Sequence, residues 1–210
     1  MDSVSYFDSI ADKWNVIREN YFENRLKYVV LSKFDIKNKI CADLGCGTGF
    51  ISLALSKDAD LVFSLDNSRN MLRQLHDECL DKKINNVYPI KGSITDIPLF
   101  DESIDVVYIN MALHHVVEAD KVIKEAYRIL KKNGSFFISD MEEHNGKWTK
   151  IEIHDKWLGF SDEQINKWMK TAGFSEVKFE DTGLKCKGYS SKGEYTETGI
   201  FIASGIKKGE

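Results

Sequence analysis

A short apolar run followed by three alternating glycines is the stretch of this sequence best suited to hold a ligand. The run covers residues 40–44, and Gly45, Gly47 and Gly49 follow it, with Asp43 just before the first glycine. Glycine lets a backbone turn tightly and approach a ligand without a Cβ, and a helix that follows would point free N–H groups at that ligand. Because an acid beside the turn repels phosphate and attracts a cation, the pattern favours a ligand with a cationic amino-acid end.

Two common nucleotide-binding patterns do not fit this turn. The dinucleotide fingerprint requires Gly or Ala where this chain has Phe50, and the phosphate-binding loop requires a Lys-Ser/Thr pair after its last glycine. A nicotinamide oxidoreductase is therefore disfavoured. An ordinary strand–turn–helix connection with chance glycines is the alternative that involves no ligand.

A second acid, Asp66, ends the next apolar run. It lies roughly twenty residues after the glycines, where an acid typically reaches the ribose hydroxyls of a nucleoside. A carboxylate can accept a hydrogen bond from both hydroxyls, although a plain surface acid would look the same in sequence. Ser68 then fits the N-cap of a helix whose inward face carries Met71.

Histidines near the same predicted edge of the sheet are the candidate bases. His114 and His115 follow the fourth predicted strand, and His144 follows the fifth. An imidazole has a pKa near working pH, so His115 and His144 are the predicted catalytic residues, with packing or capping as the alternative. Glu142, His144 and His154 match no standard metal-ligand spacing, and no metal is predicted.

The elements that must position these residues alternate between strand and helix. Apolar runs of strand length and amphipathic runs of helical period follow one another, and Pro89 places the third strand at an edge. Strands are predicted at 40–44, 61–65, 87–90, 103–109, 135–139, 177–180 and 200–203, and helices within 5–34 and at 48–56, 68–79, 120–132, 147–158 and 162–172. The last two strands are expected to be antiparallel around a long polar loop. We therefore predict an α/β fold, a doubly wound seven-stranded mostly parallel sheet with an N-terminal helical cap.

Length and composition fit one globular domain. The chain has 210 residues, of which 42% are hydrophobic and 30% charged, so we expect a single domain over 1–210, with a cap at 1–38 and a Rossmann-like core at 39–210. A net charge of −4 argues against a nucleic-acid partner. No membrane span or leader peptide is expected. The four cysteines lack disulfide or zinc spacing, which favours the cytoplasm.

The glycine turn with its leading acid resembles motif I of the class I S-adenosylmethionine-dependent methyltransferases. Ile-Asp-Val-Val at 104–107 and Leu-His-His at 113–115 resemble the small-molecule branch of that family, the ubiquinone-biosynthesis-like methyltransferase type 11. The resemblance covers residues 6–204 and is specific from 43 to 140. It implies a Rossmann-like fold, S-adenosyl-L-methionine as cofactor, and in-line transfer of a methyl group to a small-molecule acceptor. Residues 6–14 resemble a segment that forms a lid in the family, and core packing is the alternative.

The resemblance also implies which residues contact the cofactor. They are Asp43, Gly45, Cys46, Gly47, Asp66, Asn67, Met71, Ser93, Ile94 and Asn110. The family usually has an Asp that binds the adenine amino group where this chain has Ser93, which can accept a hydrogen bond but brings no charge. This departure leaves open a non-catalytic protein that binds S-adenosylmethionine or S-adenosylhomocysteine. The sequence specifies neither the acceptor nor the oligomeric state.

Overall fold

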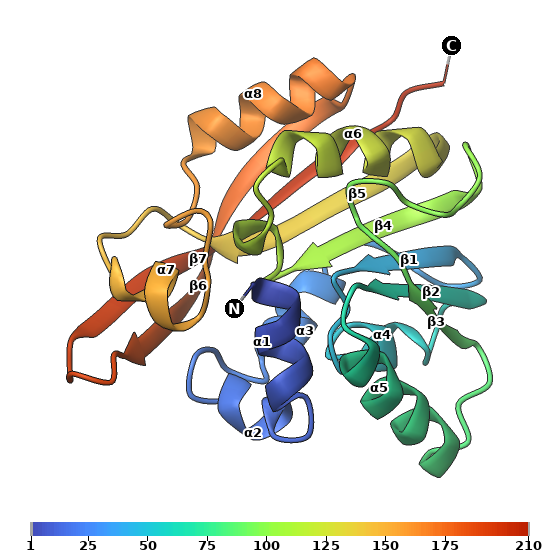
Figure 1. The fold of residues 1–210 in the computed structure, drawn as a ribbon. Coiled ribbons are helices and arrows are strands. Elements are labelled where there is room, and N and C mark those ends of the chain that lie inside the picture. Colours follow the sequence, from blue (N-terminus) through green and yellow to red (C-terminus); the bar gives the residue numbers. More distant parts are fainter. Residues whose placement is uncertain (1, 210) are drawn as a thin grey trace.

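The computed structural model describes residues 2–209, which are organised around a mixed sheet (Figure 1). Within these residues seven strands lie in the order β3-β2-β1-β4-β5-β7-β6. The parallel strands are β1 (Ile40–Leu44), β2 (Leu61–Asp66), β3 (Val87–Lys91), β4 (Ile104–Asn110) and β5 (Leu130–Met141), and β7 (Tyr195–Ile206) pairs antiparallel with β5 and β6 (Ser175–Tyr189). The predicted fold class is confirmed, and Pro89 lies on edge strand β3 as expected.

Helices cover both faces of the sheet. One buried core includes side chains of α3 (Leu26–Leu31), α4 (Ser52–Leu55) and α5 (Arg69–Asp81), and the other includes those of α6 (Ala119–Ile129) and α8 (Asp162–Ala172). The remaining helices are α1 (Ser3–Ile10), α2 (Trp14–Arg18), α7 (Trp148–Glu152) and the short 3-10 turn η1 (Leu113–His115). Figure 1 shows α1 beside the carboxyl ends of the central strands. Over the described part of the chain, every helix is too short or too polar to cross a membrane.

The central strands are buried on both faces. In β1, Cys41 packs into the core that includes α5, whereas Ala42 and Leu44 pack into the core that includes α6. This alternation follows from the two-residue period of a strand. Because β1 pairs in parallel with both β2 and β4, the carboxyl ends of these three strands meet at one edge of the sheet. Open α/β sheets bind ligands at this edge.

Local signals placed two helices correctly. Ser68 caps α5, its Oγ accepting the Met71 N–H at 3.1 Å, and the predicted inward residues of this helix are buried. Ser161 caps α8 by accepting the Gln164 N–H at 3.3 Å. Gly173 ends α8 with a positive φ of 107°. Short polar caps and a glycine stop thus set these boundaries.

Several predicted boundaries were wrong because distant partners override local pattern. The helix predicted at 120–132 ends at Ile129, since Leu130 already pairs with Ile104 of β4. The helix predicted at 48–56 is reduced to α4, and the one predicted at 147–158 to α7. The predicted loop around 186–198 consists mostly of paired strand, with Lys185–Tyr189 of β6 opposite Tyr195–Gly199 of β7.

We expect Gly173→Ala to destabilise the fold more than Gly193→Ala does. Both glycines have a positive φ, 107° and 82°, which costs another residue about 1–2 kcal/mol. A Cβ at Gly173 would also lie 2.8 Å from the Tyr127 ring, while one at Gly193 meets nothing within 4 Å in the described residues. Urea unfolding should show Gly173→Ala less stable by about 1–3 kcal/mol more than the control, and equal losses would contradict this packing.

Candidate functional site

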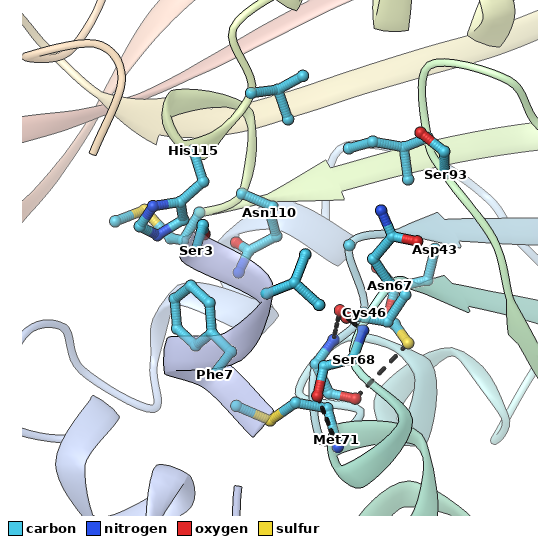
Figure 2. Close-up of a pocket in the computed structure, with 18 of the residues that line it drawn as sticks. Ser3, Phe7, Asp43, Cys46, Asn67, Ser68, Met71, Ser93, Asn110 and His115 are labelled. Atoms are coloured by element: carbon cyan, nitrogen blue, oxygen red, sulfur yellow. Dashed lines mark hydrogen bonds between the residues drawn. The ribbon is translucent and has the colours of Figure 1, made fainter. Parts of the chain in front are cut away.

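A cavity of about 330 Å³ lies at the carboxyl ends of β1, β2 and β4 (Figure 2). All ten residues predicted to contact a cofactor line it, from Asp43 on β1 to Asn110 at the end of β4. His115 lines it as well. The structure therefore brings together the residues that the sequence pattern singled out, although they span four separate segments.

The three glycines of the turn are required for different reasons. All have positive φ: 68° at Gly45, 52° at Gly47 and 92° at Gly49. A Cβ at Gly45 would lie 2.7 Å from the Ala112 Cβ, and one at Gly49 only 2.3 Å from Leu75 Cδ1. At Gly47 the nearest atom, Nε1 of Trp14, is 3.7 Å away. Packing thus requires the outer glycines, and backbone conformation alone favours the middle one.

The Asp66 carboxylate joins the two turns that border the cavity. Its Oδ2 accepts the Gly47 N–H at 2.8 Å, and its Oδ1 accepts the Ser68 N–H at 2.8 Å. Burial raises the pKa of Asp66, and these two hydrogen bonds oppose the rise. Each carboxylate oxygen has a second lone pair, so Asp66 can still accept the hydroxyls of a ribose.

Asp43 is more deeply buried and anchors a helix. Its Oδ2 accepts the Ser52 N–H at 2.9 Å and the Ser52 hydroxyl at 2.6 Å, and the residue is only 2% exposed. Burial raises the pKa of Asp43 to about 7. The side chain thus fixes the start of α4 while lining the cavity, and a nearby cation would favour its ionised form.

Helix α1 lies over the cavity and is held there by polar contacts. Asp8 accepts the Ser68 hydroxyl and the Asn70 N–H, the latter at 3.0 Å, and its carbonyl accepts Asn70 Nδ2–H at 3.0 Å. Phe7 of the same helix lines the cavity and meets the His115 ring edge-on at 4.9 Å (Figure 2). No residue within Ser3–Ile10 is fully buried, so α1 covers the cavity without joining the buried core.

Arg18 is a site residue that the sequence reasoning missed. It is 5% exposed, lines the cavity, and lies 4.3 Å from the centre of the Phe50 ring. Nη2 donates to Asn24 Oδ1 at 2.7 Å, but Nε and Nη1 are buried and have no partner among residues 2–209. Burial lowers the pKa of the guanidinium. An isolated arginine on a short helix has no sequence signal that would have identified it.

A buried histidine–carboxylate cluster lies next to His115. Asp140 is fully buried; its Oδ2 accepts the Leu113 N–H, and its Oδ1 lies 2.6 Å from His114 Nδ1. Burial alone would lower the pKa of His114, but Asp140 and then Asp155 overcome this and raise it to about 9. Burial, followed by the neighbouring His114 charge, holds the pKa of His115 well below its usual value. Asp155, predicted as part of a helix, was also missed.

His144 is placed away from this cavity. It lines a second pocket with Glu143, Trp157 and Gln164. Its Nδ1 accepts the Gly146 N–H at 3.1 Å, so a neutral ring carries its proton on Nε2. The two predicted catalytic histidines therefore face different pockets, and their roles stay predictions.

The doubly wound sheet, with a cavity at the carboxyl ends of its strands, defines a Rossmann-like fold. Residues 42–138 match the model of a family described as a methyltransferase domain. These residues therefore form a methyltransferase domain. The predicted family, enzyme class and cofactor are thereby confirmed at the level of this domain.

One curated relative shares part of the sequence, and two solved structures share the fold. A demethylmenaquinone methyltransferase of Lactobacillus johnsonii is 33% identical over 118 residues, which are 52% of this chain and 46% of that protein. The chain thus spans less than half the length of that relative. A solved [4+2]-cyclase, SpnF, has the same fold, with a TM-score of 0.80 and 16% identity over 99% of this chain and 95% of that one. Phosphoethanolamine N-methyltransferase 2 of Haemonchus contortus, solved with S-adenosyl-L-methionine, has a TM-score of 0.73 and 16% identity over 88% of this chain and 53% of that one.

Asp8→Ala should release α1 from the cavity. The substitution removes two hydrogen bonds to a carboxylate, worth about 1–3 kcal/mol of docking free energy. Hydrogen exchange of the Ser3–Ile10 amides should accelerate, while Asp12→Ala, an exposed acid just past α1, should leave it unchanged. The Ser68 hydrogen bond, and then the Asn70 N–H, lower the pKa of Asp8, so the docking it provides is lost only at acid pH. Equal exchange in both variants at neutral pH would show that Asp8 does not hold the helix.

Proposed function

We propose that this protein transfers a methyl group from S-adenosylmethionine to a small-molecule acceptor bound in the cavity. The observation that carries the proposal is that Nε and Nη1 of Arg18 lack a hydrogen-bond partner among residues 2–209, in the same cavity as the Asp66 carboxylate and the glycine turn. Nη2 is already held by Asn24 and lies 3.8 Å from Glu19. A cation and an acid at separate places suit a ligand with a carboxylate at one end and ribose hydroxyls at the other. S-adenosylmethionine has both.

The residues present fit this cofactor. Asp66 would accept the ribose hydroxyls, and Arg18 would donate from Nε and Nη1 to the carboxylate of the methionine end. Asn67, Met71, Ser93 and Ile94 line the cavity and would surround the adenine, while Asn110 would border the methionine end. When bound, the cofactor supplies a methyl group already activated by a sulfonium.

The chain's own contribution is alignment and exclusion of water. Phe7 and Trp14 line the cavity from the N-terminal helices, and Asp8 holds α1 in place. Thr48 Oγ1 donates to Asn15 Oδ1 at 2.7 Å and ties the N-terminal segment to the glycine turn. Holding two reactants in line can supply several kcal/mol of the barrier reduction, roughly 7–11 kcal/mol in the best intramolecular cases.

A small-molecule acceptor is supported by the apolar side chains and by the relatives. Phe7, Phe22, Met111 and Val116 line the cavity beside the predicted cofactor residues, and the Lactobacillus johnsonii relative is named for a quinone-type acceptor. The net charge of −4 does not favour nucleic acid. All four cysteines are free and buried, which supports a reducing compartment such as the cytoplasm.

A non-catalytic cofactor-binding protein is the second candidate. Ser93, which stands where the family usually has an Asp, favours it, as does the low pKa of His115, which makes that ring a weak base. Methyl transfer from labelled S-adenosylmethionine to any member of a panel of phenols, thiols, amines and quinols would eliminate this candidate. Binding of S-adenosylhomocysteine with no transfer across the panel would favour it.

Replacing Arg18 tests the assignment of the two ends of the cofactor. Arg18→Met should weaken S-adenosylhomocysteine binding by about 1.5–3 kcal/mol, the value of a hydrogen bond to a charged group, or roughly 10- to 150-fold. Titration calorimetry with 5′-methylthioadenosine, which lacks the amino-acid end, should show no change. Arg25→Met, at an arginine 67% exposed, is the matched control. A similar loss for both nucleosides would remove Arg18 from the carboxylate site.

Replacing Asp66 should affect both nucleosides alike. Asp66→Ala removes the predicted ribose acceptor together with the tie between Gly47 and Ser68. Calorimetry should show both S-adenosylhomocysteine and 5′-methylthioadenosine binding weaker by about 1–3 kcal/mol. An unchanged affinity for either would mean that the ribose lies elsewhere.

A further inference from the structure

Three potential metal-ligand atoms converge beside the cavity. Nitrogens of His114 and His115 and a carboxylate oxygen of Asp155 all lie within 4.8 Å of one another. Asp155 is 3% exposed and His114 is 4% exposed. Over residues 2–209, His115 Nδ1 and both Asp155 carboxylate oxygens are buried without a hydrogen-bond partner. The Thr149 hydroxyl, itself without a partner, lies beside Asp155 and can satisfy at most one of these oxygens. Buried polar atoms are rarely left unpaired, so an occupant absent from the chain itself would account for the rest.

Two of the three distances between the candidate ligand atoms are close to the edges of a metal coordination shell. His115 Nδ1 lies 3.2 Å from Asp155 Oδ1, and His114 Nε2 lies 3.7 Å from the same oxygen. Zinc–nitrogen and zinc–oxygen bonds of about 2.0–2.2 Å in a tetrahedron place neighbouring ligand atoms roughly 3.3–3.6 Å apart. The 3.2 Å contact does not form a hydrogen bond, so its atoms are close but not directed at each other.

Hydrogen bonds hold in place both the segment that carries His114 and the segment that carries Asp155. Asp140 also accepts the Met141 N–H at 2.7 Å, which keeps it an acceptor for His114 Nδ1–H, so a metal would bind His114 through Nε2 by displacing the proton there. A carboxylate behind a histidine is the usual support of a metal-bound imidazole. The segment that carries Asp155 is fixed to the same place, since the Lys156 and Trp157 N–H groups donate to the His114 carbonyl at 2.9 and 3.1 Å.

We propose that His114 Nε2, His115 Nδ1 and Asp155 bind a divalent first-row transition metal, with Zn²⁺ as the best match. Two imidazoles and one carboxylate suit this class, whereas Mg²⁺ and Ca²⁺ prefer oxygen ligands. His144 is not a ligand, because its Nε2 carries the proton. The competing occupant is a proton, which would give a His114–Asp155 ion pair and still leave His115 Nδ1 without a partner.

Three protein ligands leave a coordination position open, as in catalytic rather than structural zinc sites. His115 also lines the cavity. The open coordination position would suit a methyl acceptor with a hydroxyl or thiol group. This assignment of the acceptor rests on the proposed function. Metal binding itself does not depend on that function.

Titration of metal-free full-length protein with Co²⁺ and Zn²⁺, without nucleoside present, tests the site. We expect one equivalent to bind by calorimetry, and the Co²⁺ form to show visible bands without an intense thiolate band in the near ultraviolet. Asp155→Asn and His114→Gln should weaken binding at least about tenfold. The matched controls are Asp60→Asn, at an exposed residue just before β2, and His76→Gln, at an exposed residue of α5. Both variants should bind the metal as the unmodified protein does.

The His115→Cys variant tests the proposed metal site even if the other variants fold poorly. A cysteine is also a metal ligand, so this variant should bind Co²⁺ and gain the thiolate band. Thermal unfolding of each variant without metal shows whether it folds. Absence of stoichiometric binding by the unmodified protein would overturn the proposal. So would a thiolate band in that protein, which would place the metal on the native cysteines, or equal affinity in the Asp155→Asn variant. Failure of S-adenosylhomocysteine to bind would count against the proposed function alone.

Discussion

The cavity depends on one half-buried carboxylate, that of Asp66, which is shared by two turns. Asp66 accepts hydrogen bonds from the backbone N–H groups of Gly47 and Ser68. The Ser68 hydroxyl in turn donates to Asp8 of α1. A single chain of hydrogen bonds thus runs from the glycine turn through β2 to α1. Because burying a carboxylate is costly unless such donors satisfy it, the two turns are held at a fixed separation.

A second carboxylate organises the opposite side of the cavity in the same way. Asp140, at the end of β5, accepts backbone N–H groups from Leu113 and Met141 and faces His114. Asp66 and Asp140 are therefore satisfied within the protein. Arg18 and Asp155, by contrast, keep buried polar atoms that no described residue pairs. Asp140 therefore only builds the site, Asp66 builds it and keeps lone pairs for a ligand, and Arg18 and Asp155 have unpaired atoms left to bind one.

Much of the fold and of the cofactor side of the cavity could be predicted from local pattern. The apolar run at β1, the glycines, Asp66 and the inward face of α5 each carry their signal within a few residues. Arg18 and Asp155 could not be predicted this way, because their significance comes from contacts with sequence-distant partners. Asp155 lies where an amphipathic pattern predicts helix, yet the chain there bonds to the His114 carbonyl instead. The β6–β7 extension was missed for the same reason, since its polar residues are paired across a hairpin rather than by any local preference.

A crystal structure of the protein grown with S-adenosylhomocysteine tests the central claim most directly. The ribose should lie on the Asp66 carboxylate, the amino-acid carboxylate on Arg18, and the sulfur over the turn between Gly45 and Gly49. Nucleoside density anywhere other than over this turn would contradict the cofactor site and the proposed reaction together.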